Sequence, residues 1–135
     1  MRYITTIIVL AFLILSCSSS KQMLYDDNTF KIEEYSNDPT YGYSIKNPIK
    51  VGGAKDHIGP LNERRFLNAL AGSNGEEISY ERFGSVSNGG NEFTRVMLDK
   101  YKISYNGLEE DIILYIDMYN SGKLRVPVGF KLKHE

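Results

Sequence analysis

Two short clusters of charged residues hold the side chains best suited to chemistry in this sequence. The first is Lys55-Asp56-His57, in which a carboxylate beside an imidazole could orient a general base. The second is Glu63-Arg64-Arg65, whose guanidinium groups could bind a carboxylate or a phosphate through paired hydrogen bonds. The candidate binding residues are therefore Asp56, His57, Arg64 and Arg65.

Both clusters also have a structural interpretation that stays open at this stage. A histidine just ahead of a helix is commonly a loop or capping residue, and charged residues on a helix commonly form its solvated face. Two arginines near a helix N-terminus oppose the helix dipole, so neighbouring acids are expected to compensate them. No residue is assigned a catalytic role, because the sequence contains no nucleophile elbow, phosphate loop or dinucleotide fingerprint.

Two further groups of residues are candidate ligand sites. Glu109-Glu110-Asp111 lacks the ordered oxygens of a calcium loop, and we interpret it as a solvated turn. Several tyrosines could form an aromatic glycan-binding face, although core packing and cross-strand pairs explain most of them: Tyr41, Tyr43, Tyr101, Tyr105, Tyr115 and Tyr119. No spacing matches a zinc site, so neither a metal nor a cofactor is predicted.

Composition restricts the classes of partner and of chemistry. The formal net charge is −1, which gives no basic surface for neutralising phosphates, so nucleic acid is not an expected partner. The single cysteine, Cys17, excludes an internal disulfide, a CxxC redox pair and a cysteine-rich zinc site.

The N-terminus carries the strongest motif. Arg2 precedes an apolar run from Ile4 to Leu15, which is shorter than the roughly 20 residues that span a bilayer. The run ends in Ile14-Leu15-Ser16-Cys17, which resembles the bacterial lipobox. That resemblance implies cleavage before Cys17 and acyl chains on its thiol, which anchor a protein stably to a membrane. The alternatives are an uncleaved apolar anchor, or an ordinary secretory signal with a chance cysteine.

The lipobox resemblance also sets the expected location and the division of the chain. Serine after the lipidated cysteine is typical of release to the outer membrane, and the periplasmic face is favoured because the first acids come only at Asp26 and Asp27. Residues 1–16 are predicted to be the signal peptide and residues 17–40 the lipidated cysteine with a tether. The segment Leu24–Tyr35 could instead hold a short strand or helix. Residues 41–135 are predicted to form one domain.

Periodicity in residues 41–135 predicts an α+β fold. Pro60–Ala71 has the pattern of a helix, with Phe66, Leu67 and Leu70 on one face and Glu63, Arg64 and Arg65 mostly on the other. Alternating apolar residues predict strands over 41–51, 77–86, 98–105, 111–119 and 124–132. The expected architecture is a small, mainly antiparallel sheet of four to five strands with one main helix packed on it, and the last three strands form a meander.

Several sequence blocks resemble a family of small Bacteroidota lipoproteins. They are Tyr41-Gly42-Tyr43-Ser44, residues 47–53, residues 59–70, Ile78-Ser79-Tyr80 and residues 126–130. Family members often carry the name 2-dehydro-3-deoxyphosphooctonate aldolase, also called 3-deoxy-octulosonate-8-phosphate synthase. That enzyme is a cytoplasmic (β/α)₈ barrel, a fold of about 250 residues. The resemblance therefore implies an envelope location and transfers no catalytic residue.

The sequence leads to the expectation of a lipid-anchored envelope domain that binds a protein or glycan partner. The alternative is an enzyme, either the aldolase of the family name or a small hydrolase using His57. Convergence of Asp56, His57, Arg64 and Arg65 in one cleft would favour the enzyme or an anion site. A third class, a structural subunit of an envelope assembly, would be favoured by a free strand edge or a large apolar patch.

Overall fold

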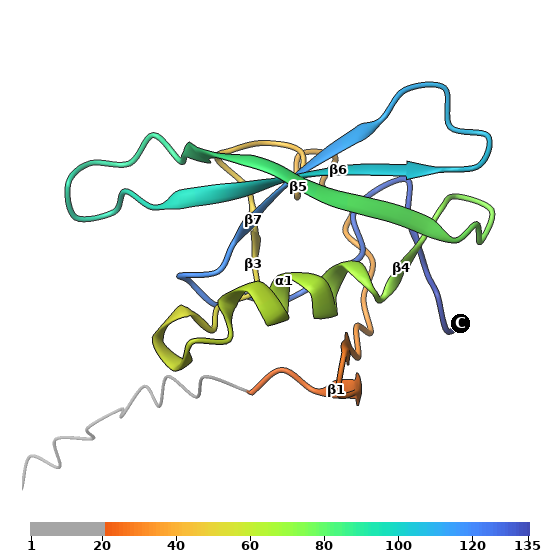
Figure 1. Ribbon diagram of the computed structural model, residues 1–135, viewed down its shortest axis with the longest axis horizontal. Coiled ribbons are helices and arrows are strands. Elements are labelled where there is room, and N and C mark those ends of the chain that lie inside the picture. The colour runs from red at the N-terminus through yellow and green to blue at the C-terminus, as the bar shows by residue number, and fades with distance from the viewer. Residues whose placement is uncertain (1–20) are drawn as a thin grey trace, which may run out of the picture.

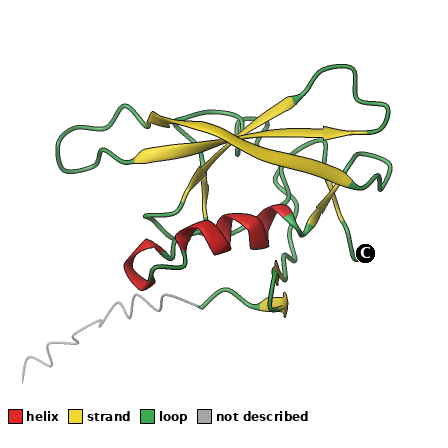
Figure 2. Cartoon of the chain, in the orientation of Figure 1, coloured by secondary structure: helices red, strands yellow, loops and turns green. Residues whose placement is uncertain are grey.

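The computed structural model describes residues 21–135, so the predicted signal peptide and Cys17 lie outside the described residues (Figures 1 and 2). The described chain has one α-helix, α1 (Gly59–Leu67), and one short 3₁₀ helix, η1 (Ala54–Asp56). The strands are β1 (Leu24–Asp26), β2 (Thr29–Phe30), β3 (Ile49–Lys50), β4 (Leu70–Ala71), β5 (Ile78–Ser87), β6 (Met97–Tyr105), β7 (Ile112–Asp117) and β8 (Lys131–Leu132).

The predicted α+β class is confirmed, and the sheet architecture differs from the prediction. The strands form three sheets instead of one: β1-β2, β3-β7-β6-β5 and β4-β8. The central sheet has four strands, of which β5, β6 and β7 form an antiparallel meander while β3 runs parallel to β7. The meander is therefore one strand earlier in the chain than predicted.

The core lies between one face of the central sheet and α1. Alternating residues of β6 and β7 point inward, and Phe66 and Leu67 of α1 are fully buried among them. The inward sheet residues include Tyr101, Ile103, Leu114 and Ile116. The predicted packing of the helix on the sheet is thus what holds the domain together.

The predicted helix over Pro60–Ala71 is shorter in the structure. Pro60 lies in its first turn as expected, because a proline there gives up no hydrogen bond. The helix ends at Leu67, and Leu70–Ala71 leaves it to pair with Lys131–Leu132 as β4 and β8. A long-range strand pair, which local periodicity cannot show, therefore replaces the last helical turn.

Two predicted strands are mostly irregular. Of residues 41–51 only Ile49–Lys50 is a strand, because Gly42 takes a φ of 83° and its N–H bonds to the carbonyl of Asn47 in a tight loop. Of residues 124–132 only Lys131–Leu132 is a strand, and Val126 makes an isolated bridge to Tyr35. Alternating apolar side chains are buried in both segments without a continuous ladder.

The predicted tether over residues 17–40 is wrong for its described part. Phe30 and Ile32 are buried in the core, and the carbonyl of Glu34 accepts the N–H of Val126. The alternative of a short strand within Leu24–Tyr35 is the one observed, as β1 and β2. Residues 21–40 thus belong to the folded domain. Within residues 21–135, no helix has the length and apolarity that crossing a membrane requires.

Candidate functional site

A groove of about 930 Å³ lies beside the start of α1, and it contains two of the four candidate residues. Its walls are the N-terminal ribbon β1-β2, the segment from Val51 to Asn62 and the loop 121–124. Asp56 and Arg65 line it, whereas His57 and Arg64 do not. The structure therefore does not bring the four candidate residues into one cleft.

His57 occupies a turn and is exposed. It follows η1 in a left-handed conformation with a φ of 59°, and its backbone N–H bonds to the carbonyl of Ala54. Asp56, one residue earlier, is exposed at the rim of the groove. Apart from glycine, this left-handed conformation is adopted most readily by asparagine, aspartate and histidine, and here it lets the chain turn between η1 and α1.

The two arginines diverge from each other. Arg65 donates from Nε to the carbonyl of Asp27 at 2.9 Å and from a terminal nitrogen to Asn62 Oδ1 at 3.1 Å. Asn62 in turn donates to the carbonyls of Val51 and Gly52. Arg65 therefore ties the N-terminal ribbon to α1.

Arg64, one residue before Arg65 and turned about 100° around the axis of α1 from it, is exposed to solvent. Burial raises the pKa of Tyr80, and the positive charge of Arg64 opposes that rise. Only Arg65 is held in a fixed network, so the paired guanidinium site that the sequence suggested is not formed.

A buried acidic cluster is the site that sequence reasoning missed. Glu63 was expected on the solvated face, and in the structure it is fully buried beneath the sheet. Its Oε2 accepts the hydroxyl of Tyr101 at 2.8 Å, and its Oε1 has no hydrogen-bond partner. Asp99, also buried, pairs with Arg82 at 2.8 Å next to it.

The surroundings of Glu63 favour its neutral form. Burial raises the pKa of the Glu63 carboxyl to about 7, and the nearby Asp99 carboxylate contributes to the rise, while the hydroxyl of Tyr101 and the charge of Arg82 oppose it. A protonated Glu63 carboxyl could donate a hydrogen bond to Asp99, whereas two ionised carboxylates at this position would repel each other. One signal of this burial was available in the sequence, since Glu63 lies three residues before Phe66.

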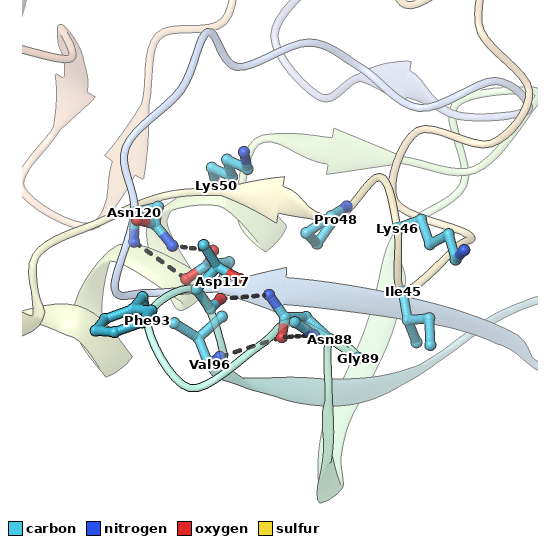
Figure 3. Close-up of a pocket in the computed structure, with 12 residues that line it drawn as sticks. Ile45, Lys46, Pro48, Lys50, Asn88, Gly89, Phe93, Val96, Asp117 and Asn120 are labelled. Atoms are coloured by element: carbon cyan, nitrogen blue, oxygen red, sulfur yellow. Dashed lines mark hydrogen bonds between the residues drawn. The ribbon is translucent and has the colours of Figure 1, made fainter.

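A second groove, of about 520 Å³, lies at the end of the sheet where β7 stops (Figure 3). Lys46 and Lys50 come from the segment around β3, Asp117 and Asn120 from the end of β7, and Phe93 from the β5–β6 loop. Asp117 accepts the backbone N–H groups of Tyr119 and Asn120, and the Asn120 side-chain amide. Its carboxylate is therefore engaged within its own turn.

The β5–β6 loop that forms one wall of this groove is held by its own asparagines. Asn88 accepts the N–H groups of Gly90 and Val96 and donates to the carbonyl of Thr94. Asn91 accepts the N–H groups of Phe93 and Thr94. This network presents Phe93 to solvent, where it is 88% exposed.

The acidic run and the tyrosines, which the sequence offered as further ligand sites, do not form binding sites in the described residues. Glu109, Glu110 and Asp111 are exposed in the β6–β7 turn, and within residues 21–135 no three His, Cys, Asp or Glu side chains gather as they would around a metal ion. Among the tyrosines, Tyr41 and Tyr101 are core residues and Tyr119 is exposed. The tyrosines therefore do not form one aromatic face.

Comparisons with known proteins give no further assignment. No family model matches the chain, and neither the curated proteins nor the solved structures include a match.

Proposed function

We propose that this chain is a lipoprotein of the cell envelope, anchored by acyl chains on Cys17 and carrying a domain that binds a protein partner. The anchor is supported by the Ile14-Leu15-Ser16-Cys17 motif and by the short apolar run before it. The proposed location is the outer membrane, on its periplasmic face.

The anchor is tested with a Cys17→Ala variant of the full chain. Acyl labelling and membrane association should both disappear, and mass spectrometry of the unsubstituted protein should find a new N-terminus at Cys17 with added acyl mass. Intact Met1 or an unmodified thiol at position 17 would contradict the anchor.

The observation that carries the binding function is Phe93. An exposed phenylalanine on a mobile tail would be weak evidence for a binding surface. The backbone of Phe93, in contrast, is held by a hydrogen-bonded loop beside a groove. Rigid aromatic side chains are typical energetic anchors of protein interfaces. Burying such a ring is worth roughly 1.5–3 kcal/mol.

The charges of the groove indicate the chemistry of the partner. Lys46 and Lys50 are exposed, and neither takes part in an ion pair among the described residues. A partner segment with an apolar pocket for Phe93 and a carboxylate for these lysines would complement the site. We therefore propose an envelope protein with an acidic, partly apolar segment.

The binding function is tested by crosslinking in intact envelopes. A photoreactive phenylalanine analogue at position 93 should give a defined protein adduct, while the same analogue at position 83 serves as a matched control on an exposed strand residue. Substituting both Lys46 and Lys50 with glutamate should abolish the adduct at position 93. The same adducts at both positions, or none at position 93, would contradict this assignment.

A further inference from the structure

The first described residues form the longest run of exposed large apolar side chains within residues 21–135. Met23 is 56% exposed, Leu24 41% and Tyr25 56%, and all three residues of β1 are exposed. β1 is the outer strand of a two-stranded ribbon, while Phe30 of its partner β2 enters the core. The ribbon is therefore firmly attached to the domain while its outer strand faces solvent.

The position of this run along the chain points to what covers it. Lys21 follows Cys17 by four residues, and a fully extended segment of four residues spans at most about 14 Å. A Cys17 held by lipid would thus keep Lys21 within that distance of the bilayer surface, and Met23, six residues after Cys17, within about 22 Å. Figure 1 places β1 on the opposite side of α1 from β5 and β6, so the sheet would face away from the membrane.

We infer that Met23, together with Leu24 and Tyr25 of β1, forms a second membrane contact that rests in the headgroup layer of the bilayer holding Cys17. This inference rests on the proposed lipid anchor. Methionine and leucine supply apolar surface, and tyrosine is enriched at membrane interfaces because its ring is apolar and its hydroxyl is polar. Tyr25 is also stacked on His134, with ring centroids 4.3 Å apart, so its ring is already positioned.

The charges around β1 indicate an apolar contact and argue against attraction to anionic lipid. The groove beside β1 is lined by four cationic side chains and three carboxylates, and two further carboxylates follow, Asp26 at the end of β1 and Asp27 in the turn. Lys31 pairs with Glu33, and Lys123 pairs with Glu34. With no excess of positive charge, the contact should depend little on the lipid headgroup charge. The turn carboxylates limit its depth to the headgroup layer.

The absence of tryptophan from the sequence allows a single-reporter experiment on the full chain. Tyr25→Trp places the reporter on β1, and Phe83→Trp places a matched reporter on β5, an exposed strand residue of the sheet. Each acylated protein is reconstituted into vesicles of phosphatidylcholine with or without bromine on its acyl chains. Brominated lipid should reduce the emission at position 25 and leave the emission at position 83 unchanged.

The outcomes separate this inference from the anchor on which it rests. The membrane contact is overturned if the protein is acylated but brominated lipid does not quench the tryptophan emission at position 25. It is also overturned if the emission at positions 25 and 83 is quenched to the same extent. Adding Met23→Glu and Leu24→Glu to the Tyr25→Trp chain should remove the quenching while the acyl mass stays, and persistent quenching would also count against it. Quenching that appears only with anionic lipid overturns the apolar mechanism. A chain without acyl mass overturns the anchor itself.

Discussion

Glu63 is the residue whose ionisation is coupled most closely to the fold. The charged groups that face it are Asp99 and Tyr101 from β6 and Arg82 from β5. Since Arg82 is already paired with Asp99, little positive charge remains to compensate an ionised Glu63. A buried carboxylate without such compensation costs free energy of folding, whereas its protonated form does not.

The stability of the domain should therefore fall as pH rises through neutrality. Burial raises the pKa of Glu63 from its ordinary value of 4.5 to about 7, so its contribution to stability is fully present below pH 4.5 and is lost as pH rises through about 7. A shift of this size corresponds to a loss on the order of 3 kcal/mol. Urea unfolding at about pH 5 and about pH 8 measures the difference.

Glu63→Gln is the matched control, because an amide keeps the acceptor for Tyr101 and cannot ionise. The variant should lose the pH dependence and should be more stable than the unsubstituted chain at about pH 8. Equal slopes of stability against pH in the two proteins would show that Glu63 does not titrate in this range.

Arg65 and Arg64 provide a second test at the scale of single residues. Arg65→Ala removes the hydrogen bond that ties the N-terminal ribbon to α1 and a second one to Asn62 within α1, so it should destabilise the domain by about 1–3 kcal/mol. Arg64→Ala, on the exposed side of the same helix, should change the free energy of unfolding by less than about 0.5 kcal/mol. Similar effects in thermal unfolding would contradict the structural role of Arg65.

The three long strands β5, β6 and β7 are the elements that the sequence predicts well, although the predicted meander is shifted by one strand. β5, β6 and β7 have alternating residues and short turns, so side-chain period and loop length together identify them. Which residues of α1 are buried and which are exposed is harder to predict. Glu63 and Phe66 are three residues apart and therefore share a face, and only the tertiary contact with Tyr101 makes burial of the carboxyl acceptable.

The segments 41–51 and 124–132 show why alternation alone is not enough. Both bury apolar residues, but tyrosine hydroxyls satisfy part of their backbone instead of a strand ladder. Tyr41 accepts the N–H of Arg125, and Tyr43 donates to the carbonyl of Val128. These bonds join positions 84 and 85 residues apart, and no local pattern encodes them.

Tyr41→Phe tests this interpretation at the scale of the element. The substitution keeps the buried ring and leaves the N–H of Arg125 without its acceptor, so it should cost about 1–2 kcal/mol of stability. Tyr119→Phe, at an exposed tyrosine, is the control and should be close to neutral. Equal midpoints of chemical denaturation in the two variants would contradict a structural role for the Tyr41 hydroxyl.

At the scale of the whole molecule, the domain begins some twenty residues earlier than composition suggests. Residues 21–40 are rich in polar and acidic side chains, so they have the pattern of a tether. Their two apolar anchors, Phe30 and Ile32, are too few to give a period, yet both reach the core. Under the proposed lipid anchor this boundary also limits the orientation of the molecule, because only three residues separate Cys17 from Lys21.

Phe30 is the residue that tests where the domain begins. In a flexible tether Phe30→Ala would leave stability unchanged, whereas a core phenylalanine replaced by alanine typically costs 3–5 kcal/mol. Phe30 is 4% exposed beneath α1, so we expect a loss within that range. Tyr25→Ala, in the same ribbon and 56% exposed, should cost far less. If both variants unfold at the same denaturant concentration as the unsubstituted chain, the ribbon is not part of the cooperative unit. The domain would then not hold β1 in a fixed position close to Cys17, and the basis for a membrane contact by β1 would be lost as well.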